Sequence, residues 1–313
     1  MTAPAGTARV TNHRASHHLS AARIEALRDG IGRPDPQKMA NLAPFRARLA
    51  DHIARGISAD RRGARQEILT VAGLSIRFGG LQALDDVNLV ARSGEVTGVI
   101  GPNGAGKTTF FNCISGLYVP DRGEITFDGR PLKGTVVSRG RRGLGRTFQA
   151  PRLFGSLTVL QNLELGCAVA ESEKRKYSFD PALTRLSRTD RAERIARLVG
   201  FRGDLKTPAS ALAFGDLRVI EFARALCAAP RLLMLDEPAS GLDVEQADDL
   251  VALLRRLADL GLAVLLIEHD MSVVMGVCDV ITVLNFGTVL ATGTPEEVQA
   301  DESVIEAYLG RSL

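Results

Sequence analysis

The stretch Val96-Thr-Gly-Val-Ile-Gly-Pro-Asn-Gly-Ala-Gly-Lys-Thr108 decides how this chain folds. Residues 96–100 form a short run with the length and apolar character of a buried strand. Residues 101–108 fit the pattern GxxxxGK[ST], and apolar residues then follow at helical spacing over 110–117. A glycine-rich loop between a strand and a helix turns successive backbone N–H groups inward, which is the geometry that cradles phosphate groups. The sequence therefore predicts a strand, a phosphate-binding loop and a helix in direct succession.

Two further apolar runs, Leu232–Leu235 and Leu262–Ile267, also end in polar residues. The first is followed by Asp236-Glu237 and the second by Glu268-His269-Asp270. Runs that are apolar on both alternating faces are typical of parallel strands covered on both sides. Ligands bind outside the carboxyl ends of such strands, so we expect all three polar segments to converge on one site.

The residue types at these strand ends indicate phosphate and metal chemistry. Lys107 would place its ammonium group on the β and γ phosphates of a nucleotide, and the Thr108 hydroxyl would reach Mg²⁺. Asp236 would hold that ion through water and Glu237 would polarise the attacking water, because adjacent carboxylates at a buried strand end need a cation or a reaction. An ordinary glycine-rich turn and a solvated Asp-Glu-Pro turn are the alternatives. His269 is either a structural histidine or a γ-phosphate contact, and we favour the contact.

The remaining segments predict a second kind of sheet and a helical insertion. Three short runs read as strands of an antiparallel layer: Ile68–Phe78, Val87–Ala91 and Glu124–Phe127. Residues 157–228 are helical in character, and Thr294-Pro-Glu-Glu carries the cap and first-turn residues that start a helix. We therefore expect an α/β fold with a parallel core sheet, an antiparallel β subdomain, an inserted helical subdomain at about 150–228 and a C-terminal helical tail at about 294–313.

Composition places the chain among ordinary globular proteins. Of its 313 residues 45% are hydrophobic and 24% are charged, which excludes a disordered, collagenous or disulfide-stapled chain and allows one or two domains. The longest aliphatic run, Leu262–Ile267, is far shorter than the ~20 residues that cross a bilayer. The N-terminus lacks the apolar stretch of a secretory signal. The four cysteines form no CxxC pair, so we expect buried thiols in the reducing cytoplasm.

The first 66 residues differ from the rest in charge. Their net charge is +7 against −4 for residues 67–313, and they hold four of the five histidines. We therefore place a domain boundary here and expect residues 1–66 to be a flexible basic extension, or the product of a start codon assigned too far upstream. The alternative is a basic amphipathic helix that lies on anionic lipid or docks on a partner. Its apolar stripe would consist of Leu42, Phe45, Leu49 and Ile53.

In their order, these motifs resemble those of the nucleotide-binding subunit of an ABC transporter, over about residues 68–313. Phe78, in Ile-Arg-Phe-Gly-Gly, occupies the position of the aromatic residue that stacks on adenine. Gln149, in Arg-Thr-Phe-Gln, is like the glutamine that senses Mg²⁺ and the γ phosphate. His269 matches the switch histidine, and Ser240-Gly-Leu-Asp243 looks like the loop by which two such subunits touch. The resemblance implies a P-loop NTPase of the ABC ATPase type, with ATP and Mg²⁺ as its cofactors.

The resemblance also implies three sets of site residues. The catalytic set is Glu237, His269 and Gln149. The metal set is Thr108, Gln149 and Asp236. The nucleotide-binding set is Phe78, Gly101, Pro102, Asn103, Gly104, Ala105, Gly106, Lys107, Thr108, Thr109 and Gly215.

The family signature, Leu-Ser-Gly-Gly-Gln, begins a helix whose N-terminus faces the ATP of the partner subunit. The matching stretch here is Leu212-Ala-Phe-Gly-Asp216, in which only Leu212 and Gly215 agree with the signature. Ala213 lacks the serine hydroxyl that would meet the γ phosphate. We therefore expect a heterodimer in which the partner supplies the better signature.

Four longer stretches of the sequence resemble the larger ATPase subunit of branched-chain amino-acid importers. They are residues 78–84, 146–154, 266–271 and 304–310. The partners implied are a second ABC ATPase subunit, transmembrane permease subunits and, indirectly, a periplasmic binding protein, with no nucleic acid. The implied location is the cytoplasmic face of the inner membrane, as a peripheral protein. The alternatives are urea or amide uptake, lipopolysaccharide export, and a non-transport ABC ATPase acting on nucleic acid or ribosomes.

Overall fold

The structure, a computed structural model, describes residues 65–148 and 151–309, and these form one compact unit. Residues 1–64 of the N-terminal extension and Gln149 lie outside the described residues, so what the sequence predicts for them stays a prediction. The strands are β1 (Glu67–Phe78), β2 (Leu81–Arg92), β3 (Val96–Ile100), β4 (Arg122–Phe127), β5 (Arg130–Pro131), β6 (Leu144–Arg146), β7 (Leu232–Asp236), β8 (Ala263–Ile267), β9 (Val280–Asn285) and β10 (Thr288–Gly293). The helices are α3 (Lys107–Ser115), α4 (Val136–Arg141), α5 (Val159–Ser172), α6 (Arg188–Leu198), α7 (Phe214–Cys227), α8 (Val244–Asp259), α9 (Met271–Val277), α10 (Pro295–Ala300) and α11 (Glu302–Leu309).

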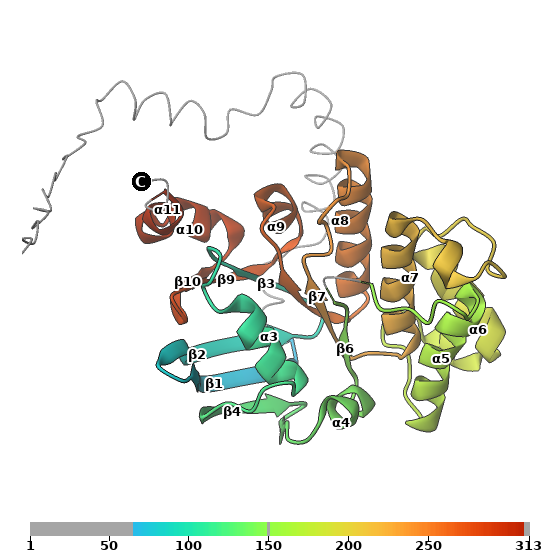
Figure 1. The fold of residues 1–313 in the computed structure, drawn as a ribbon, viewed down its shortest axis with the longest axis horizontal. Coiled ribbons are helices and arrows are strands. Elements are labelled where there is room, and N and C mark those ends of the chain that lie inside the picture. Colours follow the sequence, from blue (N-terminus) through green and yellow to red (C-terminus); the bar gives the residue numbers. More distant parts are fainter. Residues whose placement is uncertain (1–64, 149–150, 310–313) are drawn as a thin grey trace, which may run out of the picture. The chain divides into compact units, whose positions relative to one another are not determined.

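The strands form two sheets, a six-stranded one in the order β10-β9-β3-β8-β7-β6 and a four-stranded one in the order β2-β1-β4-β5 (Figure 1). The larger sheet is parallel at its centre, as the apolar runs predict: β8 pairs in parallel with both β3 and β7, and every residue of these three strands is buried. On one face, Val99, Met234 and Leu265 share a core with α3 and the antiparallel sheet. Helix α8 packs on β3 and β8, so both faces of the sheet are covered.

The antiparallel sheet contains the three predicted strands, but β2 is longer than its sequence pattern indicates. It begins at Leu81 rather than at Val87, and its register against β1 shifts along the way. Asp86 has a positive φ of 53° in this part, and its N–H donates to the Ser75 hydroxyl at 3.0 Å. An irregularity of this kind breaks the strict alternation of a strand. The pattern alone therefore located only the regular half of β2.

The segment between β6 and β7 is helical, with α5, α6 and α7 as its main elements. Helix α5 begins with a capping box at Thr158. At Gly166 it runs so close to α7 that a Cβ atom would stand 2.5 Å from the carbonyl oxygen of Arg224, so only glycine fits there. The buried Asn162 holds the start of the segment, because it accepts a hydrogen bond from the Phe154 N–H at 2.9 Å and donates one to the Phe154 carbonyl at 3.1 Å.

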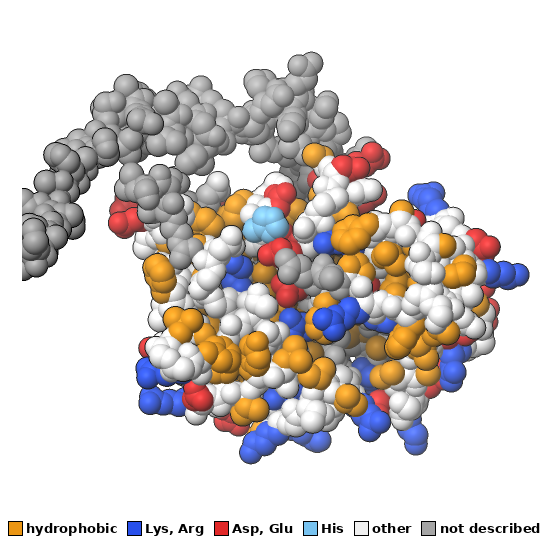
Figure 2. All heavy atoms as spheres, viewed as in Figure 1, with side chains coloured by type: hydrophobic (Ala, Val, Ile, Leu, Met, Phe, Trp, Pro, Cys, Tyr) orange, Lys and Arg blue, Asp and Glu red, His pale blue; other side chains and the backbone are white. Residues whose placement is uncertain are grey.

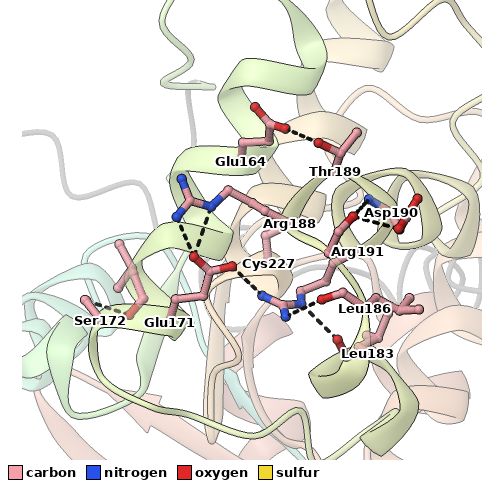
Figure 3. A network of polar contacts seen from close by, with 12 residues as sticks. Glu164, Glu171, Ser172, Leu183, Leu186, Arg188, Thr189, Asp190, Arg191 and Cys227 are labelled. Atoms are coloured by element: carbon pink, nitrogen blue, oxygen red, sulfur yellow. Dashed lines mark hydrogen bonds and ion pairs between the residues drawn. The ribbon is translucent and has the colours of Figure 1, made fainter.

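A network of ion pairs joins α6 to the end of α5 (Figure 3). Glu171 accepts hydrogen bonds from Arg188 at 2.5 Å and from Arg191 at 3.0 Å. Arg191 is buried and also donates to the carbonyls of Leu183 and Leu186. The hydrogen bond from Arg188 holds the pKa of Glu171 below its ordinary value of 4.5.

Acidification is expected to weaken this network through Glu171. Because the folded-state pKa is depressed, the contribution of the ionised carboxylate is fully present above pH 4.5 and is lost as the pH falls through the folded-state value. Glu171→Gln should therefore flatten the decline of stability in acid. Denaturation midpoints measured from about pH 7 to about pH 3 test this, with Glu193→Gln in the exposed pair with Arg197 as the control. An unchanged acid slope in Glu171→Gln contradicts the prediction.

The C-terminal helices begin where the sequence predicts. The Thr294 hydroxyl accepts a hydrogen bond from the Glu297 N–H, and the Glu297 side chain accepts one from the Thr294 N–H, which completes a capping box before α10. Helix α11 follows. All four cysteines are buried free thiols. Within the described residues, no helix is both long enough and apolar enough to cross a membrane.

Candidate functional site

Three polar segments meet at one edge of the core sheet, as the strand pattern predicts. Strand β8 lies between β3 and β7, so the loops that leave the carboxyl ends of these strands are neighbours. They are the glycine-rich loop 101–106, the pair Asp236–Glu237 and the segment Glu268–Asp270. Figure 2 shows acidic side chains gathered near the middle of the face it views, with histidine and basic side chains beside them.

Loop 101–106 has the backbone of a phosphate cradle. Gly101 has φ 151° and Gly106 has φ 102°. A Cβ atom would stand 2.1 Å from the Leu284 carbonyl oxygen at the first position and 2.8 Å from the Ala83 carbonyl oxygen at the second, so both require glycine. Gly106 is the N-cap of α3, and no described side chain caps this helix. The N-terminus of a helix favours a negatively charged ligand, because its backbone N–H groups and its dipole point toward that end.

Lys107 is folded back over this loop. Its Nζ donates to the carbonyl oxygens of Gly101 at 2.7 Å and Pro102 at 3.1 Å, and the residue is only 9% exposed. The ammonium group therefore lies within the cradle, where phosphate oxygens would replace the two carbonyls. The next residue, Thr108, is exposed in the first turn of α3.

Asp236 is a buried carboxylate at the end of β7, and its partner is Arg146 of β6. Nη2 of Arg146 lies 3.4 Å from Oδ2 of Asp236. The same guanidinium donates to Asn112 Oδ1 at 2.9 Å and to Ser115 Oγ at 2.6 Å, both on α3. Burial raises the pKa of Asp236, and the charge of Arg146 opposes that rise. The arginine therefore holds the carboxylate against the helix that follows the phosphate cradle.

Glu237 and His269 face each other across the ends of β7 and β8. Oε2 of Glu237 lies 3.7 Å from Nδ1 of His269. The Glu237 backbone has a positive φ of 50°, which is uncommon outside glycine and frequent at functional sites. The fully buried Glu268 accepts hydrogen bonds from the Ala239 N–H at 2.7 Å and the His269 N–H at 3.0 Å. It thereby joins the histidine segment to the loop that follows Glu237.

Family resemblance also suggests Phe78 and Gln149, of which Phe78 is described and Gln149 is not. Phe78 ends β1, is 44% exposed, and makes an edge-to-face contact with Tyr118 at 5.1 Å between ring centroids. Its partly exposed ring is accessible to a planar ligand. The described neighbours of Gln149 are Phe148 before it and Pro151 after it.

The segment 212–216 begins α7. Ala213 is the N-cap, and no described side chain caps the helix there, which agrees with the absence of the serine hydroxyl. Phe214 is 57% exposed, and the guanidinium of Arg218 lies 5.0 Å from its ring centroid. Asp216 sits in the first turn, where a carboxylate interacts favourably with the helix dipole.

Sequence reasoning assigned no role to three charged residues whose side chains the structure buries at this site, namely Arg146, Glu221 and Glu268. Glu221 interrupts an otherwise apolar stretch of helix α7, and Glu268 directly follows the apolar strand β8. A charge in such a position needs a partner, so the pattern signals that it is paired. The identity of each partner comes from the fold.

A phosphate cradle, a buried aspartate followed by a partly exposed glutamate, and a histidine lie at adjacent strand ends. Together they define a nucleotide-binding domain of the P-loop class. A family model described as ABC transporter matches residues 84–240, and one described as Branched-chain amino acid ATP-binding cassette transporter matches residues 288–312. The chain belongs to the ABC transporter family and is one of its nucleotide-binding ATPase subunits.

Curated relatives and a solved structure agree with this assignment. The chain is 44% identical over 259 residues to the high-affinity branched-chain amino acid transport ATP-binding protein LivG of Salmonella typhimurium, which covers 79% of this chain and 99% of the relative. It is 43% identical over 255 residues to the corresponding protein BraF of Pseudomonas aeruginosa, with coverages of 78% and 98%. An ATP-binding cassette of an ABC transporter in its ADP conformation aligns with a TM-score of 0.67 at 28% identity, over 78% of this chain and 99% of that one.

Proposed function

We propose that this chain hydrolyses ATP to energise an importer of branched-chain amino acids. The observation that carries the ATPase role is the convergence of Lys107, Asp236, Glu237 and His269 at one edge of the core sheet. The substrate class is supported by the match of residues 288–312 to the branched-chain model and by the names of the relatives. Urea uptake becomes an alternative outcome of the transport test.

In the proposed reaction, Glu237 polarises a water molecule in line with the γ phosphate. The water oxygen bonds to the γ phosphorus, the bond to the β–γ bridging oxygen breaks, and Glu237 accepts the proton that the water loses. We propose that His269, whose Nδ1 lies 3.7 Å from that carboxylate, contacts the γ phosphate. Lys107 offsets the negative charge of the β and γ phosphates, and Phe78 stacks on the adenine.

The donor set fits Mg²⁺. The Asp236 carboxylate and the Thr108 hydroxyl are oxygen donors of the kind this hard cation prefers. When bound, the ion supplies positive charge to the phosphates during transfer. Arg146 holds Asp236 in a single orientation through its bonds to α3. Gln149 is proposed as a second contact to the ion and to the γ phosphate.

Uptake measurements test the transport role and its substrate. The chain would be expressed with the permease subunits, the second ATPase subunit and the binding protein of its transporter. Labelled leucine, isoleucine, valine and urea would then be offered to membrane vesicles loaded with ATP. We expect uptake of the three amino acids that requires this chain, and its recovery in the membrane fraction on the cytoplasmic side. Uptake of urea alone, or stable binding to ribosomes or DNA with no membrane fraction, contradicts the proposal.

The incomplete signature predicts an asymmetric heterodimer. In an ATP sandwich, this chain would complete its partner's site with Ala213–Asp216, which lacks a hydroxyl donor and adds a carboxylate near phosphate charge. We expect this chain alone to hydrolyse ATP more slowly than the mixed complex, and Ala213→Ser to speed the partner's site. ATPase rates of both assemblies measure this, with Glu237 of this chain and the corresponding glutamate of the partner changed to Gln in turn. Equal rates, or no effect of Ala213→Ser, refute the asymmetry.

A further inference from the structure

We propose that Glu221 of α7 is a positioning residue that holds the backbone on both sides of Gln149, so that α7 links the signature segment to the connection carrying that glutamine. The inference rests on the proposed ATPase function and deepens it. It concerns a residue outside the site sets that the family resemblance implies.

A single buried carboxylate makes the decisive contacts. Glu221 is 4% exposed, and its Oε1 accepts a hydrogen bond from the Arg152 N–H at 2.9 Å. The same carboxylate also accepts a hydrogen bond from the Phe148 N–H. Phe148 precedes Gln149 directly, and Arg152 follows it by three positions. Glu221 therefore binds the backbone of the connection between β6 and α5 at two residues, one before and one after the glutamine in the sequence.

Two arginines on the same face of α7 add further hydrogen bonds to neighbouring backbone. Arg218 and Arg224 stand three residues before and after Glu221, so the three side chains form one polar stripe along the helix. Arg224 donates to the Arg152 carbonyl at 2.5 Å, and its guanidinium lies 5.9 Å from the Phe154 ring centroid.

At the other end of the stripe, Arg218 donates to the carbonyls of Glu237 at 3.2 Å and Pro238 at 3.3 Å. Helix α7 thus touches the backbone of the proposed catalytic glutamate, and through Glu221 the backbone that flanks Gln149. Its first turn is the signature segment. A displacement of that turn would therefore be transmitted to both loops along one rigid element.

The surroundings explain why hydrogen bonds carry this link. A cavity of about 770 Å³ lies beside the stripe, and its lining includes Phe148, Arg218, Glu221 and Asp236. Burial raises the pKa of Glu221, while the N–H groups of Arg152 and Phe148 and the charges of Arg224 and Arg218 favour its ionised form. A carboxylate kept at such a desolvation cost specifies the position of the groups it binds.

The test compares Glu221→Ala, Glu221→Gln and a matched buried carboxylate, Glu95→Gln. Glu95 is 3% exposed and accepts from the Thr97 hydroxyl at 3.2 Å, at the amino-terminal end of β3 away from the site. Loss of a buried acceptor for two N–H groups should lower kcat about tenfold or more in Glu221→Ala, with nucleotide Kd changed less than about twofold. Amide exchange at Phe148 and Arg152 should quicken by about tenfold or more. Glu221→Gln keeps one acceptor oxygen and should recover part of both effects.

The control separates positioning from general loss of stability. Glu95→Gln should leave kcat and the two amides unchanged even where it lowers the melting temperature. Wild-type kcat and wild-type exchange in folded Glu221→Ala overturn the inference, as does a loss of kcat that only follows the melting temperature in all three variants. If the wild-type chain and its complexes hydrolyse no ATP, the proposed function fails instead, and amide exchange still reports on the Glu221 contacts.

Discussion

Glu237→Gln is expected to lower the turnover number for ATP by about 10²- to 10⁴-fold, the range typical of losing a general base. The amide of glutamine cannot accept the proton of the attacking water, while its size and hydrogen-bonding shape are nearly those of glutamate. The phosphate cradle and Lys107 stay intact, so ATP binding should persist. Single-turnover hydrolysis and equilibrium nucleotide binding, measured on the same preparation, separate the two steps.

Glu193→Gln is the matched control for this substitution, because Glu193 lies on the surface of α6, where its carboxylate pairs with Arg197 at 3.0 Å. Its turnover should equal that of the wild type. A Glu237→Gln protein that hydrolyses ATP at the normal rate would remove Glu237 from the catalytic role. In that event His269, which lies 3.7 Å from the carboxylate, would be the next residue to test.

Lys107→Ala is expected to weaken nucleotide binding itself, by about 10- to 100-fold in Kd. Hydrogen bonds to a charged group are each worth about 1.5–3 kcal/mol, and the alanine protein would lose those from the ammonium to the phosphates. The structure holds this ammonium within the cradle, where it donates to the Gly101 and Pro102 carbonyls. Titration with ATP and with ADP measures the change.

The lysine's contacts also require a stability control, because Lys107→Ala removes both hydrogen bonds to the loop. Melting temperature without nucleotide should be recorded for Lys107→Ala and for the exposed Lys133→Ala. We expect ATP to raise the melting temperature of the wild type and of Lys133→Ala, and to raise that of Lys107→Ala only at much higher concentration. Equal affinity in Lys107→Ala and wild type would contradict the assigned role.

The local parts of this protein could be predicted from its sequence. A buried strand followed by GxxxxGK[ST] predicts strand, cradle and helix together, because strand burial, the glycine backbone and the helix start all depend on neighbouring residues. The same holds for the apolar runs at β7 and β8 and for the cap at Thr294. Strand β2 was predicted too short, since the irregular backbone at Asp86 hides its alternation. The roles of Phe78 and Gln149 came from family resemblance and stay proposals.

Tertiary structure alone decided which partners the buried charged side chains contact. Arg146 meets Asp236 across 90 positions of chain, Arg152 meets Glu221 across 69, and Ala239 meets Glu268 across 29. No local pattern encodes such pairs, because each partner reaches the site on a different strand or helix. A buried carboxylate in a sequence signals only that some partner must exist, since leaving it unpaired is too costly. The order of the strands and the packing of α7 beside the connection from β6 to α5 determine which partner it is.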